Sequence, residues 1–106
     1  MDSRTVLREI VKRIRREVRP QKIVLFGSRA RGRPHRHSDY DILVVKRTRR
    51  DRHNLAGDVY GVLADLPIEV DVVVYTPAEV HEWSTASRAF VTTAMREGKV
   101  LYEDKR

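Results

Sequence analysis

The sequence contains no cysteine, and this absence limits the chemistry that the chain can perform. Disulfide bonds, thiolate zinc sites and thiol nucleophiles are excluded, so a bound metal ion would need oxygen or imidazole ligands. Aromatic residues are also scarce, at 7% of the chain, whereas charged residues make up 35%. Carboxylates are therefore the side chains to consider first.

Long apolar runs are missing as well. No stretch approaches the roughly 20 apolar residues that cross a bilayer, and the charged segment 1–19 lacks the apolar region of a signal peptide. We therefore expect a cytoplasmic protein without a membrane partner. A length of 106 residues fits one domain, residues 1–106, with little room for a separate substrate-binding module.

Positive charge dominates, with a formal net charge of +7. This charge predicts a polyanionic partner but does not distinguish a nucleic acid from a nucleoside triphosphate. The basic residues form two clusters: Arg29, Arg31, Arg33, His35, Arg36 and His37, then Lys46, Arg47, Arg49, Arg50 and Arg52. The second cluster is typical of a solvated loop and helix start. The two histidines fit a basic loop better than a pair of metal ligands.

Apolar periodicity predicts an alternation of helices and strands. Apolar residues at helical spacing predict a first helix that begins after Asp2 or Ser3 and ends before Pro20. A second apolar helical face runs from Leu55 to Leu66 and is closed by Pro67. Short β-branched runs predict buried strands at residues 22–26, 41–45 and 68–75.

The last third of the chain carries clear helix signals. Thr76, Pro77 and Glu79 provide an N-cap, a proline in the first turn and a capping-box glutamate. Residues 90–95 supply a final helical stripe, and Gly98 stands where a C-terminal capping residue is expected. We expect residues 100–102 to add a short edge strand.

Gly27 and Ser28 follow directly on a predicted buried strand. A glycine there lets the backbone turn sharply and lets a phosphate approach the exposed amides, and the serine hydroxyl adds another donor. Gly-Ser pairs are also common in ordinary loops, so this pair alone does not decide between a structural turn and a phosphate site.

Asp39 and Asp41 stand two residues apart at the entry to the second predicted strand. An extended backbone points both carboxylates to the same side, which is a cation-binding arrangement. Their mutual repulsion would raise one pKa unless a cation or a basic group compensates. The alternative is a capped loop before the strand, with Ser38 and Asp39 as turn residues.

Asp71 interrupts the valine-rich third strand, where a buried and unpaired carboxylate would be costly. A metal ion or an arginine would neutralise it. The alternative is an open sheet face, since Glu69 and Asp71 share one side of the strand and could both remain hydrated.

These motifs combine into a known pattern. Gly27 and Ser28 are followed by ten residues from Arg29 to Ser38, then by Asp-x-Asp at Asp39 and Asp41, and a third acid, Asp71, stands in a later strand. This pattern resembles the signature of the DNA polymerase β-like nucleotidyltransferase superfamily. The segments GSRARG, SDYDILVV, VDVVVYT and REGKVLYE are similar to the minimal nucleotidyltransferases, the small partners of HEPN-domain toxins in toxin–antitoxin pairs.

The resemblance covers most of the chain and implies both a fold and a site. The fold is α/β (α+β), with a short mixed β-sheet, helices packed on one face and the acidic edge open. Asp39 and Asp41 would bridge two Mg²⁺ ions, and Asp71 would complete the site that activates the attacking hydroxyl. Gly27 and Ser28 would hold the β- and γ-phosphates of ATP. Additional positive charge near the triphosphate would come from Arg29 and Arg31.

The resemblance also implies a reaction, the transfer of AMP from ATP to a tyrosine of a cognate HEPN ribonuclease, which would make the protein an antitoxin. A docked partner would supply the acceptor surface that so short a chain lacks, although a homodimer could do so too. Neutralisation by binding without catalysis is a second hypothesis. A small-molecule or nucleic-acid acceptor normally needs extra domains, and a simple nucleic-acid-binding module leaves Asp71 unexplained.

Overall fold

The computed structural model describes residues 2–32, 39–84 and 90–104, which form four helices and four strands. The basic-cluster residues Arg33, His35, Arg36 and His37, and the turn residue Ser38, lie outside this part of the chain. In chain order the elements are α1 (Ser3–Val18), β1 (Lys22–Phe26), β2 (Tyr40–Val45), α2 (Arg52–Leu63), β3 (Val70–Tyr75), α3 (Pro77–Glu82), α4 (Phe90–Glu97) and β4 (Lys99–Glu103).

The strands form one mixed sheet in the order β3-β2-β1-β4. Strand β1 pairs antiparallel with both β2 and β4, whereas β2 and β3 run parallel. A parallel pair needs a crossover connection, which α2 supplies. The expected edge strand near residues 100–102 is confirmed as β4, and the expected mixed αβ class is confirmed as well.

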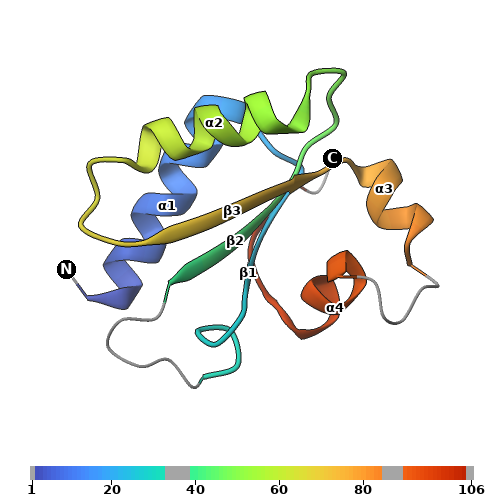
Figure 1. The fold of residues 1–106 in the computed structure, drawn as a ribbon. Coiled ribbons are helices and arrows are strands. Elements are labelled where there is room, and N and C mark those ends of the chain that lie inside the picture. Colours follow the sequence, from blue (N-terminus) through green and yellow to red (C-terminus); the bar gives the residue numbers. More distant parts are fainter. Residues whose placement is uncertain (1, 33–38, 85–89, 105–106) are drawn as a thin grey trace.

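Two apolar clusters lie on opposite faces of the sheet. The long helices α1 and α2 lie side by side over one face, where Ile10, Ile14, Ile42 and Val59 are fully buried (Figure 1). On the other face, α4 packs against a smaller cluster around Val24 and the neighbouring strand β2. The prediction of helices on one face therefore holds for the two long helices, while α4 covers part of the second face.

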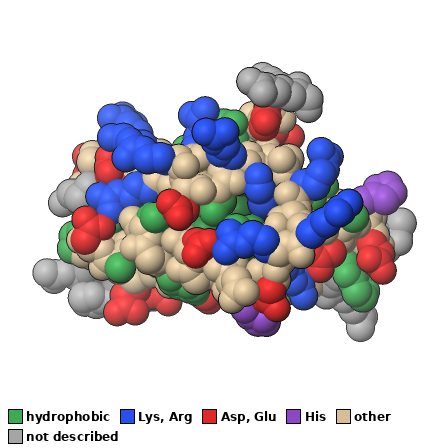
Figure 2. Space-filling model, turned by 90° about the horizontal axis from the view of Figure 1, so that it is seen from above, with side chains coloured by type: hydrophobic (Ala, Val, Ile, Leu, Met, Phe, Trp, Pro, Cys, Tyr) green, Lys and Arg blue, Asp and Glu red, His purple; other side chains and the backbone are tan. Residues whose placement is uncertain are grey.

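The outer surface of the α1 and α2 layer is highly charged. Figure 2 views the molecule from that side and shows Lys and Arg side chains in several groups, with Asp and Glu side chains between them. None of the helices that the structure describes is both long and apolar enough to cross a bilayer.

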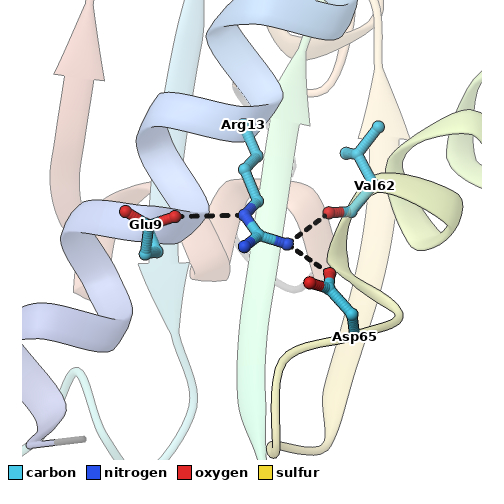
Figure 3. A network of polar contacts seen from close by, with 4 residues as sticks. All are labelled: Glu9, Arg13, Val62 and Asp65. Carbon is cyan, nitrogen blue, oxygen red and sulfur yellow. Dashed lines mark hydrogen bonds and ion pairs between the residues drawn. The ribbon is translucent and has the colours of Figure 1, made fainter.

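Arg13 joins the two long helices (Figure 3). Its Nε donates to Oε1 of Glu9 at 3.1 Å, and its terminal nitrogen donates to the carbonyl of Val62 at 3.0 Å and to the carboxylate of Asp65. The hydrogen bonds to Asp65 and Glu9 raise the pKa of Arg13. The hydrogen bond from Arg13 lowers the pKa of Asp65. This network fixes the C-terminal end of α2 against the middle of α1.

Two predicted element bounds need correction. Helix α2 begins at Arg52 and ends at Leu63, so Leu66 lies beyond it in a buried turn, and β3 starts at Val70 rather than at Ile68. The amide of Leu66 bonds to the carbonyl of Leu63, which closes residues 63–66 into a turn directly before Pro67. Periodicity alone does not separate this buried turn from a last helical turn.

Gly98 is required for a different reason from the expected one. Its φ is not positive, so it is not a left-handed cap. A Cβ at this position would come within 2.4 Å of Val24 Cγ1 and within 2.5 Å of the Ala94 carbonyl oxygen. Glycine therefore lets the end of α4 pack directly against β1.

Candidate active site

The strand register brings two of the three predicted acids together. Asp41 is aligned with Phe26 on β1 and with Asp71 on β3, so the carboxylates stand on neighbouring strands at the same level of the sheet. Asp39 lies two residues before Asp41 and is exposed. Because alternate residues of an extended chain share a face, the acids gather on the α4 side, opposite the α1 and α2 layer.

The pKa of Asp41 reports this crowding. Partial burial of its carboxylate raises the pKa, and the negative charges of Asp71 and Asp39 raise it further. Arg31 acts in the opposite direction and lowers the pKa, but it does not offset the other effects. The three acids therefore form one electrostatic unit that a cation would stabilise.

Gly27 lies in close contact with the Asp41 carboxylate and has a left-handed backbone conformation. Its φ of 75° lies in the left-handed region, and a Cβ at this position would stand 2.1 Å from Oδ2 of Asp41. The carbonyl of Gly27 then accepts hydrogen bonds from the amides of Ala30 and Arg31, which curl the chain into a tight turn. Both the turn and the adjacent carboxylate thus require glycine here.

The two predicted arginines take different places around this turn. Arg31 is exposed and acts on the charge of Asp41. The Arg29 guanidinium instead stacks 3.9 Å from the centre of the Tyr40 ring, and Tyr40 belongs to the core on the α1 side. Ser28 lies half-buried in the turn between Gly27 and Arg29. Arg31 is therefore better placed than Arg29 to meet a phosphate beside the acids.

Asp71 has a partner that the sequence did not indicate. The hydroxyl of Tyr60 on α2 donates to Oδ1 of Asp71 at 3.2 Å and accepts from the amide of Val72 at 2.8 Å. Asp71 is exposed, so burial does not force it to have a positively charged partner. The alternative prediction, an open sheet face on which Asp71 stays hydrated, is confirmed. The only sequence signal for Tyr60 is an aromatic residue outside the apolar face of its helix.

The three carboxylates are chemically suitable ligands for a hard cation such as Mg²⁺, but their side chains do not converge on one point. Among the described residues, no group of three or more His, Asp or Glu side chains is arranged to hold a metal ion. Carboxylate oxygens are the ligands that Mg²⁺ prefers. Burial and the neighbouring charges of Asp71 and Asp39 raise the pKa of Asp41, and a bound cation would oppose both effects.

A cleft of about 260 Å³ opens beside the acids. Its described walls come from the end of β1, the turn after it and α4: Phe26, Gly27, Arg31, Phe90, Thr93, Ala94 and Glu97. The rings of Phe26 and Phe90 meet edge to face at 5.3 Å, and Phe90 is half exposed. The cleft offers an apolar surface next to the glycine turn.

The second basic cluster lies at the opposite end of β2. Arg50 pairs with Asp58 at 2.8 Å, and Arg52 pairs with Glu79 at 2.8 Å. Lys46 donates to the carbonyl of Arg19. Arg50 and Arg52 thus form ion pairs at the start of α2, whereas Lys46 contacts the end of α1. The four arginines of the cluster are exposed, as predicted for a solvated loop and helix start.

A family comparison agrees with this geometry. The family described as "Nucleotidyltransferase domain" matches the chain over residues 7–98, which include the glycine turn and all three acids. The chain belongs to this family. Transfer of a nucleotidyl group is therefore its class of chemistry. No curated protein matches the sequence.

Solved toxin–antitoxin structures are similar to the chain. A toxin–antitoxin with AMP-PNP shares 31% identity over 93% of this chain and 74% of its own, with a TM-score of 0.59. A toxin–antitoxin described as MntA-HepT shares 26% identity over 97% and 74%, with a TM-score of 0.55. A tri-AMPylated HEPN toxin of Shewanella oneidensis in complex with an MNT antitoxin shares the fold, at 24% identity over 96% and 73% and a TM-score of 0.56. The resemblance to minimal nucleotidyltransferases is confirmed.

Proposed function

We propose that the protein is a Mg²⁺-dependent adenylyltransferase that moves AMP from ATP to a tyrosine of a HEPN-domain toxin and thereby acts as its antitoxin. The observation that carries this proposal is the acid cluster beside the glycine turn, in a chain of the nucleotidyltransferase family. The solved neighbours include one with AMP-PNP and one with an AMPylated HEPN toxin, which supports ATP and a protein acceptor.

The binding roles follow from the positions of the residues. Asp39 and Asp41 would hold the Mg²⁺ ions, and Asp71 would complete the site from the neighbouring strand. The ions, when bound, would stabilise charge on the attacking and leaving oxygens. Gly27 and Ser28 would hold the terminal phosphates, because the glycine turn lets phosphate oxygens approach the backbone amides.

The chain's own residues would orient the two reactants. Arg31 faces the same site as Asp41 and would compensate charge on the triphosphate. Arg29, stacked on Tyr40, would add to the positive field from behind the turn. The acceptor oxygen would attack the α-phosphorus, and the bond from that phosphorus to the oxygen that bridges to the β-phosphate would break. Pyrophosphate would leave, and the hydroxyl proton would pass to water. Positioning and charge stabilisation account for most of the rate in such transfers.

Mass spectrometry of the partner tests the proposal. Incubated with ATP, Mg²⁺ and its cognate HEPN-domain protein, the chain should add one or more AMP units to that protein. Asp71→Asn should still form the complex but leave the partner unmodified. If the parent adds no AMP, the proposed reaction is wrong. If Asp71→Asn protects cells from the toxin as well as the parent does, neutralisation occurs by binding and does not need the reaction.

A further inference from the structure

An open groove of about 860 Å³ runs along the outer side of α1. It lies at the β4 edge of the sheet, and β3 forms the opposite edge. It exists because two helices cover a sheet of four strands, and α1 leaves the outer strip of β4 uncovered on that face. Its described lining combines cations of α1 and its C-terminal cap with apolar residues of α1 and β4, and it includes one acid, Asp104. The groove and the acid cluster lie on opposite faces of the sheet.

The cations of this groove form a regular stripe. Arg8, Lys12 and Arg15 follow one another at intervals of four and three residues, so they project from one side of α1 over about 10 Å. Arg19, the C-terminal capping residue of that helix, also lines the groove. All four are exposed. Arg13, on another side of the same helix, is neutralised by two acids. Within the described part of the chain, Arg8, Lys12 and Arg19 form no ion pair.

The floor of the groove is apolar. Leu7, Val11, Leu101 and Tyr102 are partly buried and pack against the core from the groove side. Tyr102 is the one aromatic side chain among the described lining residues, and the Arg15 guanidinium covers its ring at 4.2 Å. Single-stranded nucleic acid needs uncovered aromatic faces for its bases, whereas an aliphatic floor with a basic rim suits a peptide chain.

We propose that this groove docks an acidic, partly apolar segment of the protein that the chain modifies. Apolar side chains of the segment would cover the floor, and its carboxylates would pair with the cationic stripe. Because the groove lies on the face opposite the acids, docking leaves the nucleotide site open. It raises the local concentration of the acceptor tyrosine, which reaches the site from another part of the same partner. This inference rests on the proposed function.

Charge reversal in the groove tests the docking. Arg8→Glu combined with Lys12→Glu should weaken binding of the cognate HEPN-domain protein about tenfold, by calorimetry, since each exposed charge contributes a modest amount. The apparent KM for that protein should rise to a similar extent, while kcat and ATP affinity stay unchanged. The matched control is Arg49→Glu combined with Arg96→Glu, which changes net charge equally at exposed positions outside the groove. It should bind and react like the parent.

The outcomes separate this inference from the proposed function. If the parent modifies its partner but the groove variant binds that partner as tightly as the parent does, the docking surface is wrong and the reaction stands. Equal loss in the groove variant and in the control also contradicts docking, because net charge alone would explain it. A groove variant that loses binding of a single-stranded RNA oligomer, yet keeps partner affinity, would assign the groove to RNA. If the parent modifies nothing, the proposed function itself fails.

Discussion

The two ends of strand β2 differ in whether nearby charged side chains have partners of opposite charge. Beyond its C-terminal end, Arg50 and Arg52 each pair with an acid 2.8 Å away. At its N-terminal end, Asp39, Asp41 and Asp71 repel one another, and the positive charge acting on Asp41 comes from Arg31. The same strand therefore leads at one end to cations that are paired with acids, and carries at the other end acids that repel one another.

This contrast separates a structural use of charge from a functional one. Paired surface charges contribute little to stability, and their loss is tolerated. Crowded like charges destabilise the free protein and persist where a ligand supplies the missing charge. The acid end is accordingly the place where a cation and a triphosphate are expected to bind.

Neutralising one acid should have the largest effect. Asp41→Asn removes the carboxylate that is aligned with Asp71 and touches the glycine turn, so AMP transfer should fall about a thousandfold, as expected for several kcal/mol of lost charge stabilisation. The control is Asp58→Asn, which removes an acid that pairs with Arg50 at the other end. Its transfer rate should equal that of the parent. Equal losses in both variants would remove the distinction between the two ends.

A methyl group at the glycine turn should have the next largest effect. Gly27 and Gly32 both have positive φ, so an alanine at either position should destabilise the fold by about 1–2 kcal/mol. Only Gly27→Ala also presses on Asp41, because a Cβ at Gly32 meets no atom within 4 Å. Chemical unfolding of both variants measures the difference. If Gly27→Ala is no less stable than Gly32→Ala, the contact with Asp41 is not tight.

The pH dependence of stability should show the strain at the acid end. The folded pKa of Asp41 is raised, so its charged form is disfavoured by folding. At pH values below its ordinary pKa the group is protonated in both states and no penalty arises, and the penalty grows as pH rises through the folded pKa. Without divalent cations, Asp41→Asn should therefore become more thermally stable than the parent as pH rises above about 4. A parent that gains stability over Asp41→Asn with rising pH would contradict the repulsion.

The smallest effect is expected at the paired end. Arg52→Ala removes an ion pair with Glu79 and a stack over Tyr75, but both side chains of the pair are partly exposed. The free energy of unfolding should fall by less than about 1 kcal/mol, and the rate of AMP transfer should not change. Glu79 keeps its capping bond to the Thr76 amide at 2.8 Å, which limits the damage. A large loss of transfer in this variant would show that the two ends are coupled.

Much of this contrast could be predicted from the sequence. The order of elements, the glycine turn and the pair Asp39 and Asp41 follow from local patterns, because alternation and turn chemistry involve neighbouring residues. The approach of Asp71 to Asp41 follows only from the parallel register of β2 and β3. In the sequence, the family resemblance indicates this approach, whereas residue spacing does not.

Other features depend on contacts between distant segments. The bond from Tyr60 to Asp71 joins α2 to a strand edge, and no pattern within either segment indicates it. The position of Gly98 after a helix predicts a capping role, whereas its close packing on Val24 depends on how α4 meets the sheet. The stripe of cations on α1 is visible in the sequence, but the groove beside it appears only once β4 is placed.

Calorimetric titration of ATP, with and without Mg²⁺, tests the central claim about the acid end most directly. In the parent, Mg²⁺ should tighten ATP binding, because the ion neutralises carboxylates that otherwise repel the triphosphate. The double variant Asp39→Asn with Asp41→Asn should bind ATP to the same extent in both conditions. Metal-independent ATP binding in the unmutated protein would contradict the account.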